Sequence, residues 1–309
     1  MVLHLRQITV DRPIASLSVS RDGSLVAVGI EASVELIDFD SGSRTGRVVA
    51  DAEVSGLAFS ADKQLLAVAS GAPTVRVYDC ESGRLVLKLL RTSVPDFLRK
   101  QRQIQVEFLG TGRTLITRAD NSDVTIWNCE MGEWEHLFRM PHRNAVCAVS
   151  PDGKHFAMFG EPNPNQYTGQ VTVYRMNQGP EHRWHKHHGN DKRVTSAGFS
   201  PDGSRLATGG AGDGIRVWNV DTGEPMFQIP ERDGGPFLGA MFVADEHHLL
   251  TIQDHILGAF KLGDAGPLST ININRARGTA GFCGSADGTA VATYDNETGI
   301  DLWKVSKTP

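Results

Sequence analysis

The 309-residue chain lacks the features that mark several large classes of protein. Its four cysteines include no Cys-x-x-Cys pair and no zinc-finger spacing, so neither a disulfide framework nor a metal site is predicted. No apolar run approaches the length that spans a bilayer, and residues 1–6 do not form the apolar core of a secretory signal. These absences favour a cytoplasmic protein without a membrane segment.

An excess of basic residues is also missing, because 31 Lys and Arg stand against 36 Asp and Glu. That balance disfavours an obligate nucleic-acid binder, which needs a basic field to contact phosphates. The chain has no nucleophile elbow and no phosphate-binding loop. Its glycine-rich stretch at 209–214 lies between two short strands, so we expect a turn there. The sequence therefore predicts no enzyme and no cofactor.

What the chain does contain is one short pattern that recurs from end to end. An apolar run ends in a Ser-Pro-Asp-Gly-like turn, a second apolar run follows, and a third ends in an aromatic residue. The turns stand at 20–23, 60–63, 110–113, 150–153, 200–203, 243–246 and 285–288. Their spacing of roughly 40 to 50 residues is the period expected of propeller blades.

Each copy is predicted to form four short antiparallel strands, which cannot bury both faces of a sheet alone. Sheets stacked around an axis solve that problem and leave only short edges. A strand expected at 4–10 precedes the first inner strand at 14–19, and the third strand of the last copy lies at 300–305. Pairing the N-terminal strand with that last strand removes two exposed edges.

The predicted fold is therefore all-β: a seven-bladed β-propeller of four-stranded antiparallel blades, closed by the N-terminal strand. We expect residues 1–309 to form a single domain, with residues 1–13 completing the last blade.

The ends of the third strands carry a resemblance to a known family. These strands end in Tyr78-Asp79, Trp127-Asn128, Trp218-Asn219 and Trp303-Lys304. On these motifs the chain resembles the WD-repeat β-propeller family over essentially its whole length, and its turns look particularly like those of prokaryotic members. The resemblance implies a platform for protein–protein interaction, since the fold itself hosts many functions.

No copy carries the complete buried network of His, Asp, Ser or Thr, and Trp that is frequent in that family. Stability is therefore expected to come mainly from apolar packing between blades. The expected contributors are Trp127, Trp218, Trp303, Phe199 and Phe242. Trp134 and Trp184 are expected on outer strands, and the sequence leaves open whether they belong to the core.

Longer connections predict where a partner binds. In blades of this kind, the loops between second and third strands and between blades share one face, the top. Extra length falls at 92–103, 161–170 and 185–193. The first and third of these segments are rich in basic residues, and the second contains Tyr167. Arginine pairs carboxylate and phosphate groups bidentately, so we expect an acidic or phosphorylated peptide partner. The predicted top rim consists of Arg99, Lys100, Arg102, Tyr167, His185, Lys192 and Arg193.

Other interpretations of the same residues stay open. The basic residues are also explained as solvated loop charges, and the histidines at 182–188 do not have a spacing typical of metal ligands. A basic rim is also compatible with RNA or single-stranded nucleic acid. A metal-dependent enzyme that uses residues converging in the central channel ranks below both binding roles.

Overall fold

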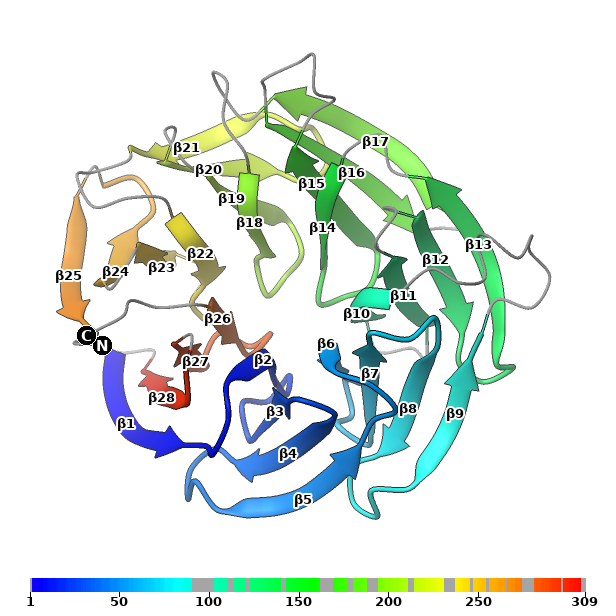
Figure 1. Ribbon diagram of the computed structural model, residues 1–309. Coiled ribbons are helices and arrows are strands. Elements are labelled where there is room, and N and C mark those ends of the chain that lie inside the picture. Colours follow the sequence, from blue (N-terminus) through cyan, green and yellow to red (C-terminus); the bar gives the residue numbers. More distant parts are fainter. Residues whose placement is uncertain are drawn as a thin grey trace.

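Seven sheets of four antiparallel strands stand around a central axis, as Figure 1 shows. This computed structural model describes residues 2–90, 103–110, 114–119, 123–139, 143–161, 169–176, 180–187, 194–210, 214–230, 237–244, 247–253, 256–264, 266–273, 281–295 and 297–306. At 134, 136–139, 143–146, 160 and 161 the description covers the backbone alone. Over these ranges no helix is long and apolar enough to cross a membrane. The predicted all-β, seven-bladed propeller is confirmed.

The first four blades follow chain order from the inner to the outer strand. Blade one comprises β2 (Ile14–Val19), β3 (Leu25–Ile30), β4 (Ser33–Asp38) and β5 (Arg44–Val49). Blade two comprises β6 (Val54–Phe59), β7 (Leu65–Ser70), β8 (Val75–Asp79) and β9 (Leu85–Leu89). Blade three comprises β10 (Gln103–Leu109), β11 (Thr114–Ala119), β12 (Asp123–Asn128) and β13 (Glu133–Arg139). Blade four comprises β14 (Arg143–Val149), β15 (His155–Glu161), β16 (Gln170–Met176) and β17 (Pro180–His187).

The last three blades complete the ring. Blade five comprises β18 (Val194–Phe199), β19 (Arg205–Gly210), β20 (Gly214–Asn219) and β21 (Pro225–Ile229). Blade six comprises β22 (Phe237–Phe242), β23 (His248–Gln253), β24 (Ile256–Lys261) and β25 (Pro267–Asn272). Blade seven comprises β26 (Gly281–Gly284), β27 (Ala290–Tyr294), β28 (Gly299–Val305) and, outermost, β1 (Val2–Thr9).

The N-terminal strand closes the ring as predicted. β1 pairs antiparallel with β28 from Val2 opposite Val305 to Thr9 opposite Gly299. Near the middle of this pairing, His4 Nε2 lies 3.1 Å from Asp301 Oδ1. Blade seven thus combines strands from both ends of the described chain, which satisfies backbone groups that an open edge would expose.

The turn between the first two strands of a blade has the same internal bonds in five blades. The serine hydroxyl donates to the aspartate two residues later at 2.5–2.8 Å, and it accepts the backbone N–H five residues later at 2.9–3.0 Å. The residue after the aspartate has positive φ, which glycine adopts without strain. Lys63 occupies this position in blade two at φ +53°. The turns are therefore local structures set by their own side chains.

The core consists of seven apolar clusters, and each one fills the space between two neighbouring blades. The five aromatic residues predicted to contribute are all buried, including Trp127 at 2% exposure and Phe242 at 2%. In three blades the indole N–H donates to a threonine hydroxyl on the adjacent strand. These pairs are Trp127–Thr117 (2.9 Å), Trp218–Thr208 (2.7 Å) and Trp303–Thr293 (3.1 Å).

Trp184, which the sequence left open as a core residue, belongs to the core. Although it lies on an outer strand, Trp184 is buried and belongs to the cluster between blades four and five. Its indole N–H donates to the Val220 carbonyl at 2.6 Å, and its ring centroid lies 5.9 Å from that of Trp218. It is covered by the next blade's outer turn, where Gly223 at φ +69° leaves room that a Cβ would fill. The side chain of Trp134 lies outside the description.

Candidate functional site

Of the predicted top rim, only His185 falls within the described residues. Arg99, Lys100, Arg102, Tyr167, Lys192 and Arg193 lie outside them. The strands that flank their segments are described: β9 ends at Leu89, β15 at Glu161 and β17 at His187. The rim itself therefore stays a prediction.

His185 lies within β17 rather than in a loop, because this strand continues to His187 and so includes the first three residues of the connection predicted at 185–193. Its Nδ1 is 2.9 Å from the Thr172 hydroxyl on β16, and its ring centroid lies 5.7 Å from that of His187. Burial lowers the pKa of His185, and the neighbouring His187 and His182 lower it further. Among the described residues, no group of three His, Cys, Asp or Glu could hold a metal ion.

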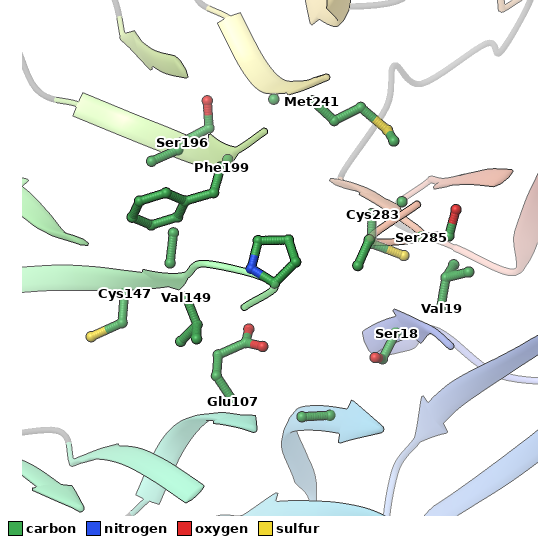
Figure 2. Close-up of a pocket in the computed structure, with 18 of the residues that line it drawn as sticks. Ser18, Val19, Glu107, Cys147, Val149, Ser196, Phe199, Met241, Cys283 and Ser285 are labelled. Atoms are coloured by element: carbon green, nitrogen blue, oxygen red, sulfur yellow. The ribbon is translucent and has the colours of Figure 1, made fainter. Parts of the chain in front are cut away.

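A cavity of about 470 Å³ runs along the central channel. It is lined by residues of all seven inner strands and of the turns that follow them (Figure 2). The side chains around this space are mainly small or apolar. Arg21 and Glu107 are the charged residues among those that line it in the described part of the chain.

Strand register aligns one residue of each blade at the same level of the channel. Each of these residues stands two before the position of the turn serine, which is Leu109 in blade three and Val243 in blade six, and its partner on the second strand stands nine residues later. We call this set the channel ring: Ser18, Ala58, Glu107, Ala148, Gly198, Met241 and Cys283, all of which line the cavity. Six members are neutral, so Glu107 on β10 is the only ionisable carboxyl at this level.

The carboxyl group of Glu107 points into the space between the inner strands (Figure 2). Burial raises the pKa of Glu107 to about 7, against a hydrogen bond from Gln105 that lowers it. Burial disfavours the charged form of an acid because the channel wall replaces water around it. Glu107 is therefore poised to change its charge near neutral pH.

The side chain of Gln105 connects blades three and four beside this carboxyl. Its Nε2 donates to the Cys147 carbonyl at 2.8 Å, and its Oε1 accepts the Cys147 backbone N–H at 3.1 Å. The amide therefore pairs with β14 as another strand's backbone would. Burial raises the pKa of Cys147 to about 12 and also raises that of Cys283, so both thiols in the channel are unreactive at neutral pH.

At the turn side of the channel, Arg21 reaches from blade one to blade four. Its Nη1 donates to the Pro151 carbonyl at 3.1 Å. Both residues line the cavity and belong to turns that follow inner strands. The Arg21 side chain therefore lies across the mouth of the channel on the side of these turns. This mouth is about 10 Å along the strand direction from the channel ring.

Sequence reasoning did not single out Glu107. A signal existed: counting two residues back from each turn gives Ser, Ala, Ala, Gly, Met or Cys in the other blades. Blade three has Leu109 where five blades have the turn serine, which hides this alignment in the sequence. The register of β10 with β11, with Glu107 opposite Ile116, makes it visible.

Comparison with known proteins supports the predicted repeat type. Residues 43–79 and 180–219 match the family described as WD domain, G-beta repeat. Each segment begins with the outer strand of one blade, β5 or β17, and continues through the first three strands of the next. In these two segments the sequence repeat is therefore offset from the blade, so that each one spans two neighbouring blades. These matches support a WD-repeat propeller.

Three whole proteins with similar sequences are each less than 30% identical to this chain. The chain is 26% identical over 304 residues to Cell division cycle 20.5, cofactor of APC complex, from Arabidopsis thaliana, covering 93% of this chain and 63% of that protein. It is 27% identical over 225 residues to the Periodic tryptophan protein 2 homolog from Mus musculus, covering 70% of this chain and 20% of that protein. It is 28% identical over 176 residues to Apoptotic protease-activating factor 1 from Rattus norvegicus, covering 55% of this chain and 12% of that protein.

The chain thus spans less than two thirds of the length of each of these relatives. All three come from eukaryotes, so the expected likeness to prokaryotic members is not supported. The geometry shows a seven-bladed propeller, and the comparisons show that two of its segments are similar to the WD repeat.

Proposed function

We propose that this propeller is a protein-interaction scaffold, without catalytic activity of its own, whose top face binds a protein or peptide partner. The observation that carries the proposal is the closed ring of seven blades with WD-type repeats. The Arabidopsis thaliana relative, whose match covers 93% of this chain, is named as a cofactor of the APC complex. A rigid ring suits this role because a preformed surface loses little conformational freedom on binding. We expect it to act in the cytoplasm.

The proposed contact surface is the top rim defined above. β9 ends and β10 begins at this face, and so do β15 and β16, and β17 and β18, because the strands of each blade alternate in direction. The connections between these ends carry the rim residues in the sequence, with the basic ones in the first and third connections. Arginine forks favour carboxylate and phosphate, so the proposed partner segment is acidic or phosphorylated.

The test is quantitative affinity purification of the tagged protein from its native cells, with three baits compared. The baits are the wild type, the rim variant Arg99→Glu with Arg102→Glu, and a control variant Arg47→Glu with Arg84→Glu. Arg47 and Arg84 are exposed on the outer circumference, at β5 and just before β9. The control therefore makes the same charge change away from the top face.

A protein recovered with the wild type and the control variant, but lost from the rim variant, is the expected result. Direct binding of that protein to the purified propeller, measured in both variants, then separates a contact from an indirect effect. If both charge-reversed variants retain every partner, the rim proposal is wrong. Recovery of nucleic acid, with affinity that falls steeply as salt rises, would replace the protein scaffold by the nucleic-acid role.

A further inference from the structure

The scaffold role makes no use of Glu107. An acidic side chain in a channel wall loses hydration, which is unfavourable unless a partner compensates for it. The other blades build the same level of the ring with serine, alanine, glycine, methionine or cysteine, so closure of the propeller does not need a carboxyl there. The one residue that departs from the neutral ring is also the one whose charge a ligand could use.

The rest of the channel wall is suited to the apolar part of a small molecule. Leu17, Val149, Phe199, Leu238 and Phe282 line the cavity. Its volume of about 470 Å³ lies within the range of small-molecule sites, which are mostly apolar with a few placed polar groups. Figure 2 shows Val149, Phe199 and Met241 around the same space into which the Glu107 carboxyl points.

We propose that the channel binds a small organic cation, a protonated amine with an apolar body, whose ammonium group pairs with Glu107. The ammonium group donates hydrogen bonds to the carboxylate, and the apolar body packs on the neighbouring strands. The interaction is strengthened because the channel wall replaces part of the water that would screen it.

Charge complementarity favours a cation over the other simple ligand classes at the level of the channel ring. Arg21, the lining cation, lies about 10 Å along the strand direction from that level and donates to the Pro151 carbonyl at 3.1 Å, so an anion beside Glu107 would meet a carboxyl group rather than a cation. A metal ion would need several ligands, and the described residues contain no cluster of three that could hold one. A neutral ligand would leave the carboxylate of Glu107 without a counter-charge.

The charge of Glu107 makes binding depend on pH. The other ionisable groups around it are Cys147 on β14, Cys283 on β26, Arg118 on β11 and Arg21 beyond β2. Both thiols stay neutral and both guanidinium groups stay charged between pH 6 and 8. With a pKa of about 7, Glu107 is about one tenth ionised at pH 6 and about nine tenths at pH 8. Amine affinity should therefore rise about tenfold across this interval.

The experiment titrates 2-phenylethylammonium into the full-length protein by calorimetry at pH 6, 7 and 8. The uncharged analogue 2-phenylethanol reports the contribution of the apolar body alone. Glu107→Gln keeps the shape of the side chain but removes the charge, and Glu53→Gln changes an exposed glutamate outside the channel. Thermal unfolding of both variants verifies that they fold. Nuclear magnetic resonance of the Glu107 carboxyl carbon measures its pKa with and without the amine.

We expect the wild type and Glu53→Gln to bind the amine more tightly at pH 8 than at pH 6. We expect Glu107→Gln to bind it at least tenfold more weakly at pH 8, without that pH dependence. The amine should also lower the pKa of Glu107. The proposal is overturned if the wild type does not bind the amine at millimolar concentration. It is equally overturned if Glu107→Gln binds as the wild type does, or if the alcohol binds as tightly as the amine.

Discussion

The hydrogen bond between Trp127 and Thr117 allows a sharp test of how blade three is held together. The indole N–H donates to the threonine hydroxyl at 2.9 Å, and the two residues are 2% and 1% exposed. Thr117→Val preserves the shape of the side chain but removes the acceptor. The Trp127 N–H then stays buried without a partner, because the close packing on both sides leaves little room for water.

A buried donor without a partner lowers the free energy of unfolding by about 1–3 kcal/mol, and we expect about 2 kcal/mol here. For a chain of this length that corresponds to a fall of about 3 °C in Tm. The measurement is urea denaturation followed by circular dichroism, where the midpoint should fall while the slope stays unchanged. Thr270→Val, on the exposed outer strand β25, is the matched control and should change stability by less than about 0.5 kcal/mol.

A double-mutant cycle isolates the bond itself. Trp127→Phe removes the donor, so in that background Thr117→Val should lower the free energy of unfolding by no more than about 0.5 kcal/mol. If Thr117→Val has the same effect in both backgrounds, the loss comes from changed packing of the valine. In that case the reasoning about an unsatisfied donor is wrong.

Three further predictions follow from the blade contacts. Trp184→Ala removes a side chain packed on Trp218 and should lower the free energy of unfolding by about 3–5 kcal/mol in urea denaturation. Deletion of residues 2–9 exposes the edge of β28 and should increase aggregation measured by light scattering. Burial raises the pKa of Asp202, but hydrogen bonds from Ser200 and Ser204 outweigh it and lower the pKa to about 2. Its stabilising contribution is therefore present above about pH 4 and lost as the pH falls toward 2, so Asp202→Asn should flatten the acid limb of the stability profile.

Each of these predictions has a control or an outcome that contradicts it. Leu268→Ala changes a residue that is 56% exposed, so a loss as large as that of Trp184→Ala would argue against a buried role for the tryptophan. A truncated chain that stays monodisperse and equally stable would show that β1 contributes little to closure. Asp11→Asn, at an exposed position, should leave the acid limb unchanged. An Asp202→Asn profile that matches the wild type would rule out the turn carboxylate as its cause.

Much of this fold could be predicted because its signals are local. The Ser-x-Asp turns form from bonds between residues two to five positions apart, and alternation of apolar residues depends only on strand geometry. The predicted first inner strand at 14–19 matches β2, and the closing strand expected at 4–10 is observed at 2–9. Topology then followed from counting strands, since an unpaired first strand and an incomplete last blade complement each other.

The features that escaped prediction depend on neighbours distant in the sequence. Trp184 lies on an outer strand, and it is buried because the turn at Gly223 of the next blade covers it. The bond from Arg21 to Pro151 joins residues 130 positions apart. The top rim rests on loop length and charge, which are sequence properties that do not specify a binding geometry, and it remains a proposal.

By itself, then, the sequence determined the number of blades, the chemistry of five of their turns and the way the ring closes. The strands and turns follow from short-range preferences, and the closure follows from counting the strands. Only the tertiary structure decided that Glu107 faces a channel in which it meets six neutral residues from six other blades. The pKa of that carboxyl depends on how much water the assembled ring leaves around it. No stretch of sequence around Glu107 contains that information, because the walls of the channel come from residues spread between 17 and 286.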